Sequence, residues 1–313
     1  MTDLEMAIAV AAVIAVGWIV VANLRDRIRV QRATAVVPSR DQEPAIFTAP
    51  VERVLESVMP NAFSDAIATL TFSRPLSTEQ VYQALRGWRH VGSKPLSFAW
   101  SSDGGAFLAQ PGQGGVTALQ VGVLLATRSG PLHAMEYSEW QSTLDRLARE
   151  LGAALDLPSM TDVLSRARSL DQQCASVDAQ LTVSVSTAEV LSAAAIQSAA
   201  ERLGLESRGE SRYAMGPLHH QRFVVFPGDG GGRLTFLLDL PRTTAPIEAF
   251  PSRVDIAEQF AQALSGVLTD ESGRPLSELA LAQIAQQVEE RVAQFEQMGV
   301  VPGSQVAQRL FLS

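Results

Sequence analysis

The residues of this chain that could do chemistry are few and do not form a recognisable catalytic set. Its four histidines are His90, His133, His219 and His220, and none lies in an HExxH motif or beside a spaced pair of carboxylates. Because zinc needs three or four converging ligands, these histidines predict no metal site. The single cysteine, Cys174, has no base placed beside it in the sequence, which favours a structural role over a nucleophilic one.

The stretch PGDGGG at residues 227–232 has the glycine content of a phosphate-binding loop. Such a loop continues into Lys and Ser or Thr and opens a helix, whereas this stretch lies between two predicted strands and therefore indicates a hairpin turn. The chain also has no GxSxG motif. We therefore predict that the protein is not an enzyme and needs no cofactor and no small-molecule substrate.

The composition predicts a globular protein that does not bind nucleic acid. Of the 313 residues, 46% are apolar, which is enough to build a buried core. The formal net charge is −8, and no run of basic residues suggests the positive face that nucleic-acid binders present. With one cysteine, no disulfide can form within the chain, which fits a reducing compartment.

The elements that would position a site begin with a predicted membrane anchor. Residues 6–24, MAIAVAAVIAVGWIVVANL, carry no charge and are long enough to cross about 30 Å of hydrocarbon as a helix. A cleaved signal peptide would start with basic residues, but this start is acidic. Four arginines follow the apolar segment: Arg25, Arg27, Arg29 and Arg32. The positive-inside rule then places the N-terminus in the periplasm and the rest of the chain in the cytoplasm.

The remaining chain divides into a linker and two segments that repeat the same order of predicted elements. Each segment opens with an alternating strand, ATLTFS at 68–73 and AQLTVS at 179–184, followed by a helix. Two strand-like runs follow, matched as 96–100 with 211–215 and 106–110 with 222–226. Next comes a strand in which every second residue is apolar: Leu119, Val121, Val123 and Leu125 in one copy, and Leu234, Phe236, Leu238 and Leu240 in the other. Two amphipathic helices close each copy, at 140–155 and 160–173, and at 253–268 and 277–295.

These patterns predict an α+β fold with an antiparallel-rich sheet and helices on one face, built twice in tandem after one transmembrane helix. The predicted boundaries are 1–32 for the anchor with its basic stretch, 33–63 for a proline-containing linker, 64–174 for the first unit and 177–313 for the second. The alternative is a chance similarity between two ordinary α+β domains.

The second segment carries several stretches that together suggest a family. They are LTVSVST at 181–187, FLLDLPR at 236–242, LTDESGRPLSELALAQI at 268–284 and PGSQVAQRLF at 302–311. In these stretches, and in the order of its elements, it resembles the C-terminal domain of the ZipA family of bacterial cell-division proteins, which tether FtsZ to the inner membrane. The predicted anchor agrees with that family, whereas the short linker and the second copy of the domain depart from it.

The resemblance implies an apolar groove on the uncovered face of the sheet, which takes the C-terminal peptide of FtsZ. Carried over strand by strand, it implies these partner-binding positions: Thr182, Ser184, Tyr213, Phe226, Thr235, Leu237 and Arg274. The alternate residues Leu181, Val183, Phe236 and Leu238 are then expected in the core. The resemblance therefore implies a cell-division adaptor for FtsZ at the bacterial inner membrane. The alternative is a membrane-anchored scaffold of the same fold that binds another cytoplasmic partner.

Overall fold

The computed structural model describes residues 58–102, 104–216, 222–228 and 231–312. The predicted anchor at 6–24 and nearly all of the predicted linker lie outside these residues, as do His219 and His220. In the part of the chain that is described, no helix is long and apolar enough to cross a membrane. The described fold is α+β with antiparallel sheets, as the sequence predicted.

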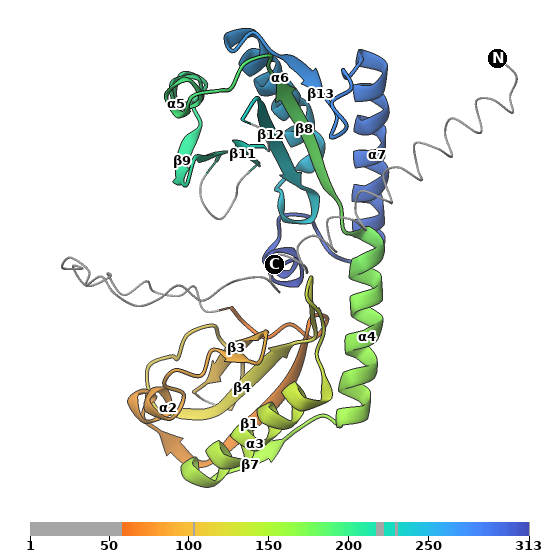
Figure 1. The fold of residues 1–313 in the computed structure, drawn as a ribbon. Helices are drawn as coiled ribbons and strands as arrows, with labels where there is room; N and C mark the ends of the chain where they lie inside the picture. Colours follow the sequence, from red (N-terminus) through yellow and green to blue (C-terminus); the bar gives the residue numbers. More distant parts are fainter. Residues whose placement is uncertain (1–57, 103, 217–221, 229–230, 313) are drawn as a thin grey trace, which may run out of the picture. The chain divides into compact units, whose positions relative to one another are not determined.

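The first unit is a five-stranded antiparallel sheet with the strand order β2-β3-β4-β1-β7 (Figure 1). Its strands are β1 (Asp65–Leu76), β2 (His90–Val91), β3 (Lys94–Ser101), β4 (Val116–Leu124) and β7 (Ala153–Asp156), and a separate hairpin is formed by β5 (Ala126–Thr127) and β6 (Gly130–Pro131). Its helices are α2 (Thr78–Ala84), α3 (Ala134–Leu151) and α4 (Met160–Val177).

Local sequence explains where the helices of the first unit begin and end. Ser77 and Gln80 form a capping box at the start of α2, which satisfies backbone donors that the helix itself leaves free. Gly152 ends α3 in the left-handed conformation, with φ of 63°, so the helix stops before the 155 expected from its periodicity. The chain then continues directly into β7.

The alternating residues of β4 form the core of the first unit. Leu119, Val121 and Val123 are fully buried, and Leu125, just after the strand, is 1% exposed. They belong to one apolar cluster with Val81 of α2 and with buried residues of α3, including Trp140 and Leu144. The predicted burial of this strand is therefore confirmed.

The second unit is a six-stranded antiparallel sheet with the order β13-β8-β12-β11-β10-β9. Its strands are β8 (Gln180–Ser186), β9 (Glu206–Gly209), β10 (Arg212–Met215), β11 (Phe223–Pro227), β12 (Arg233–Asp239) and β13 (Val267–Thr269). Its helices are α5 (Ala193–Arg202), η1 (Leu240–Arg242), α6 (Pro246–Ala263), α7 (Glu278–Gln297) and α8 (Gln305–Leu310). Figure 1 shows α6 packed along the sheet, where Phe260 meets Phe236 of β12 with ring centroids 5.4 Å apart.

The two sheets share four strands in the same sequential order but differ at one edge. The spatial order of neighbouring strands β7-β1-β4-β3 in the first sheet corresponds to β13-β8-β12-β11 in the second. The expected strand at 106–110 is wrong: the structure has no strand there, and Leu108 forms an isolated bridge to Trp100 of β3. Strand β3 lies directly against β4, as β11 lies against β12 in the second sheet. Residues 96–100 of β3 therefore correspond to β11 and not to residues 211–215, as had been predicted.

The pairing also corrects how the opening strands match. Ala68 pairs with Val121, and Val183 pairs with Phe236, so Ala68 corresponds to Val183 and not to Ala179. The shift is an even number of residues. It therefore preserves the face that each side chain occupies, which is why the alternation pattern did not reveal it.

Three ion pairs, made by two arginines, connect residues of the two units. Arg128, between β5 and β6, binds the carboxylates of Asp178 and Asp239 at 2.6–3.0 Å. Arg309 of α8 binds both carboxylate oxygens of Asp65 in β1, at 2.6 and 2.9 Å. Asp65 is 1% exposed, so Arg309 compensates a charge that would otherwise be buried alone.

Candidate functional site

The candidate site is the face of the second sheet opposite α6, which we call the open face. Along β12, Leu234, Phe236 and Leu238 are fully buried toward the helix, while the residues between them are half-buried. Because successive side chains of a strand alternate, Thr235 and Leu237 lie on the opposite side from Phe236. The predicted core positions Val183, Phe236 and Leu238 are buried, and Leu181 packs against that core from a half-buried position.

Three side chains give the open face an apolar patch, defined here as Val224, Phe226 and Leu237. Strand pairing sets Val224 opposite Leu237, and Phe226 opposite Thr235. All three residues of the patch are half-buried. Ala214 of β10 pairs with Val224 but is fully buried, so the patch ends at Val224 on this side. The arrangement can bury apolar side chains of a peptide from water.

The residues carried over on β8 lie on the open face but are engaged within the unit. Thr182 pairs with Leu237 and donates a hydrogen bond to the carboxylate of Glu271. Ser184 is only 2% exposed, and its hydroxyl lies 3.4 Å from that of Thr235. This side of the face is therefore polar, and Ser184 presents little surface to a partner.

Tyr213 does not lie on the open face, which corrects its predicted placement. It pairs with Val225, which is fully buried, and Tyr213 itself is 7% exposed. Register is the reason, because a difference of one residue in pairing moves every side chain of a strand to the other face. Arg212, the neighbour of Tyr213, instead lies over the Phe226 ring, with its guanidinium carbon 5.9 Å from the ring centroid.

Arg274 lies at the rim, in the turn after β13. Its side chain is 71% exposed, and its Nε donates to Asp270 at 3.0 Å. Sequence reasoning missed Val224 and Arg212. The alternation of residues 223–227 pointed to Val224 and Phe226 together, whereas nothing in the sequence set the register of β10 against β11.

Charged residues occupy both ends of the open face. At one end, Arg233 donates from Nη1 to the backbone oxygen of Glu271 at 3.1 Å. At the other end, Asp239 is held by Arg128 of the first unit. Burial lowers the pKa of Arg128, but hydrogen bonds and charge from Asp239 and Asp178 outweigh burial, so the net shift is upward and Arg128 stays charged.

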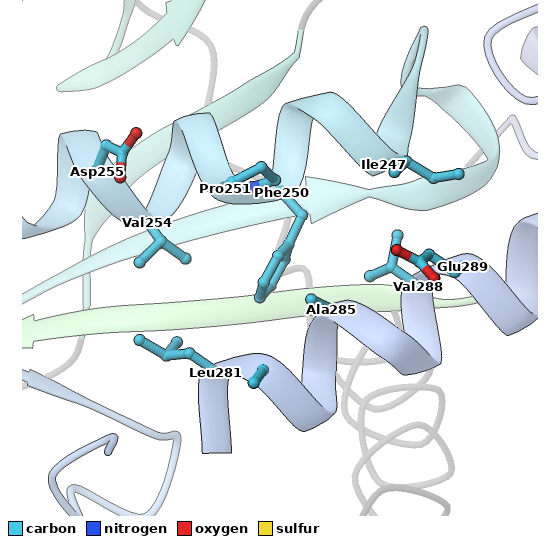
Figure 2. Close-up of a pocket in the computed structure, with 10 residues that line it drawn as sticks. Ile247, Phe250, Pro251, Val254, Asp255, Leu281, Ala285, Val288 and Glu289 are labelled. Carbon is cyan, nitrogen blue, oxygen red and sulfur yellow. The ribbon is translucent and has the colours of Figure 1, made fainter. Parts of the chain in front are cut away.

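A separate pocket of about 440 Å³ lies between α6 and α7, on the helical side of the unit. Figure 2 shows Phe250 and Val254 pointing from α6 toward α7, where Leu281 and Val288 complete the lining, while Asp255 points away. The pocket is lined mostly by apolar side chains, and its charged lining residues are Asp255 and Glu289. It offers packing surface and no evident chemistry.

Two buried titratable groups of the described residues, Cys174 and Arg253, have structural roles. No three His, Cys, Asp or Glu side chains among them could hold a metal ion together. Cys174 is buried in α4, and burial raises the pKa of its thiol to about 12. Arg253 of α6 is fully buried, and burial lowers the pKa of its guanidinium to about 9. Its Nη1 donates to the backbone oxygen of Leu181 at 2.6 Å, which joins α6 to β8.

On the corresponding face of the first sheet, the described residues form no apolar patch. Gly122 pairs with Ile67 of β1 and with Ser97 of β3, where the second sheet pairs Leu237 with Thr182 and Val224. A Cβ on Gly122 would lie 2.9 Å from Cβ of Pro60, so the chain itself covers this position. Ser97 is 2% exposed. This face therefore has small and polar side chains at the position of the patch, and Pro60 already covers part of it.

Comparison with known protein families gives a match within the second unit. Residues 214–287 match the model of the family described as ZipA, C-terminal FtsZ-binding domain. The match begins at Ala214 within β10, includes β11, β12, β13 and the start of α7, and so contains Val224, Phe226 and Leu237. A comparison with curated proteins gave no match.

Proposed function

Because residues 214–287 carry the FtsZ-binding domain of the ZipA family, we propose that this chain is a cell-division adaptor that binds the C-terminal peptide of FtsZ and tethers it to the inner membrane. The observation that supports this most directly is the apolar patch on the open face, which lies within the matched residues. Cell division and FtsZ binding follow from the family, while the residues that bind and the membrane anchor are the finer part of the proposal.

The proposed binding mode is a short peptide docked on the patch. A few apolar anchors usually supply most of the affinity in such complexes, whether the peptide is helical or extended. Burying one side chain of the size of leucine or phenylalanine contributes about 1.5–3 kcal/mol. Three half-buried residues therefore provide enough surface for specific binding of a peptide, without the large area of a permanent interface.

Calorimetric titration of the protein with the FtsZ C-terminal peptide tests this proposal. Leu237→Asp should weaken binding by about tenfold or more, because the new charge would lose water when the peptide docks. The matched control is Thr71→Asp, an exposed residue on the face of the first sheet that we expect not to bind. Melting curves of both variants show whether the fold persists. Absence of binding by the unaltered protein would refute the FtsZ proposal, and unchanged affinity of the Leu237 variant would move the site elsewhere.

The proposed anchor consists of residues 6–24, with the N-terminus in the periplasm. Its support is the uncharged stretch followed by arginines, which the inner membrane retains on the cytoplasmic side. A reporter that is active only in the periplasm should be inactive when fused after Ser313. Activity of that fusion would reverse the orientation and remove access to a cytoplasmic partner.

One observation favours a second candidate, a scaffold of the same fold with another cytoplasmic partner. The open face is polar along β8, where Thr182 already bonds to Glu271 and Ser184 is buried. A different peptide with more hydrogen-bonding groups would suit that half of the face. Titration with the FtsZ peptide separates the two candidates, because this scaffold would not bind it.

We further propose that the first unit is a diverged copy that lost its groove. The shared path of four strands supports a common origin, and Gly122 with Pro60 above it removes the surface that a peptide would use. The chain should then bind one FtsZ peptide. Calorimetry that gave two equivalent peptides per chain would contradict this part of the proposal.

A further inference from the structure

Arg212 is an exposed arginine at the edge of the open face, beside the apolar patch. It follows a tight turn in which Glu210 and Ser211 both have positive φ, at 49° and 58°. That turn places Arg212 first in β10, and its guanidinium carbon lies 5.9 Å from the centroid of the Phe226 ring. A guanidinium stacked in this way gains a cation–π attraction while its N–H edge stays free to donate.

The other arginines around this face have acceptors, which sets Arg212 apart. Arg208 binds Glu206 and the backbone oxygen of Gly216, and Arg233 and Arg274 bind groups in the turn after β13. Within the described residues, the Arg212 side chain makes no hydrogen bond and no ion pair; its contact is with the Phe226 ring. Its five N–H donors are therefore available to a partner.

The acidic groups on the same face are already engaged. The carboxylate of Glu271 accepts from Thr182, and that of Asp239 binds Arg128. Arg212 is the charged group that contacts Phe226 of the apolar patch, and its charge is positive. A partner that complements it carries a carboxylate close to an apolar side chain, because that side chain would pack on Phe226 while the carboxylate reached the guanidinium.

From this geometry we infer that Arg212 is a specificity residue of the peptide site, which binds a carboxylate of the docked peptide next to the side chain that packs on Phe226. The inference rests on the proposed binding of a peptide to the open face and adds the chemistry that the peptide must have. An acidic residue in the peptide is required, and a neutral amide at that position is discriminated against.

A double-mutant cycle between protein and peptide tests the inference. The proteins are the full chain and its Arg212→Gln variant. The peptides are the FtsZ C-terminal peptide and a version in which every Asp and Glu is replaced by Asn or Gln. Arg212→Gln should weaken binding of the acidic peptide about tenfold, as expected for loss of a charge-assisted hydrogen bond. It should leave affinity for the amide peptide nearly unchanged.

Arg202→Gln provides the matched control, because it removes the same charge from an exposed position on α5, where Nε donates to Ser198 of the same helix. This control variant should bind both peptides as the unaltered protein does. Equal losses for the two peptides, or an equal loss in the Arg202 variant, would show that Arg212 acts only through folding or general charge and would overturn the inference. If the unaltered protein binds neither peptide, the FtsZ proposal itself fails. Binding that is insensitive to Arg212 refutes only the present inference.

Discussion

Gly122 of β4 and Leu237 of β12 occupy equivalent positions in the two sheets. Gly122 pairs with Ile67, and adding the same number of residues to both partners gives the pair of Leu237 with Thr182. At this position one sheet has no side chain and is covered by Pro60, while the other presents a half-buried leucine. At this position the face of the first sheet is closed by its own chain, whereas the face of the second sheet presents an apolar side chain.

Gly122→Ala should destabilise the protein. A Cβ at this position would lie 2.3 Å from Oγ of Ser97 and 2.9 Å from Cβ of Pro60, and Ser97 is itself held by a hydrogen bond to Asp65. The neighbouring atoms must shift to accommodate the methyl group, which should lower the free energy of unfolding by about 1–3 kcal/mol. Urea denaturation measures the loss, with Thr71→Ala on the same face as the control. A change as small as that of the control would mean that Pro60 does not pack on Gly122.

The neighbours Arg212 and Tyr213 should respond to alanine in opposite ways. Tyr213→Ala removes a buried aromatic side chain and should lower the free energy of unfolding by about 3 kcal/mol. Arg212→Ala, at an exposed position, should leave the melting temperature nearly unchanged. Thermal denaturation of the two variants distinguishes them. The reverse pattern would place Tyr213 on the open face and require a different register of β10.

The ion pair between Arg128 and Asp239 should couple the two units energetically. Their side chains are 12% and 22% exposed, so solvent screening is weak compared with that of surface pairs. A double-mutant cycle with Arg128→Gln and Asp239→Asn should give a coupling energy of about 1–3 kcal/mol. Urea denaturation of the four proteins supplies the values. Additive effects of the two substitutions would show that the pair contributes nothing to the contact between the units.

Cys174 should be unreactive in the folded protein and should make stability depend on alkaline pH. Burial raises the pKa of its thiol to about 12, whereas an unfolded thiol titrates near 9. Between these values the folded state keeps a proton that the unfolded state releases, so the contribution of this group to stability is lost as pH rises above about 9. The loss is about 1.4 kcal/mol per pH unit.

Two measurements check the prediction for Cys174. Iodoacetamide should label the thiol slowly at pH 8 in the native protein and rapidly in urea. Urea denaturation between pH 9 and 11 should show a steeper fall of stability than in Cys174→Ala. Rapid labelling of the native protein, or equal pH dependence in the two proteins, would show that the thiol is accessible to solvent.

Periodicity in the sequence determined which residues of the central strands are buried. Phe236 and Leu238 face α6, and Val121 and Val123 face the first core, because alternation along a strand is a local property of the chain. The resemblance to the ZipA domain predicted Phe226 and Leu237 on the opposite face, in agreement with this alternation. The α+β class and the resemblance to the ZipA domain also came from the sequence, and the family match confirmed that resemblance.

The tertiary structure decided everything that depends on one strand meeting another. The pairing of β10 with β11 puts Arg212 and not Tyr213 beside Phe226, and the direct contact of β3 with β4 leaves 106–110 outside the first sheet. The bonds from Arg309 to Asp65 join residues from opposite ends of the described chain. Periodicity indicates whether a residue is buried, but it does not indicate which residue of another strand it contacts. Alternation along each strand therefore predicts which residues share a face of a sheet. Which residues are adjacent on that face depends on strand pairing in the folded chain.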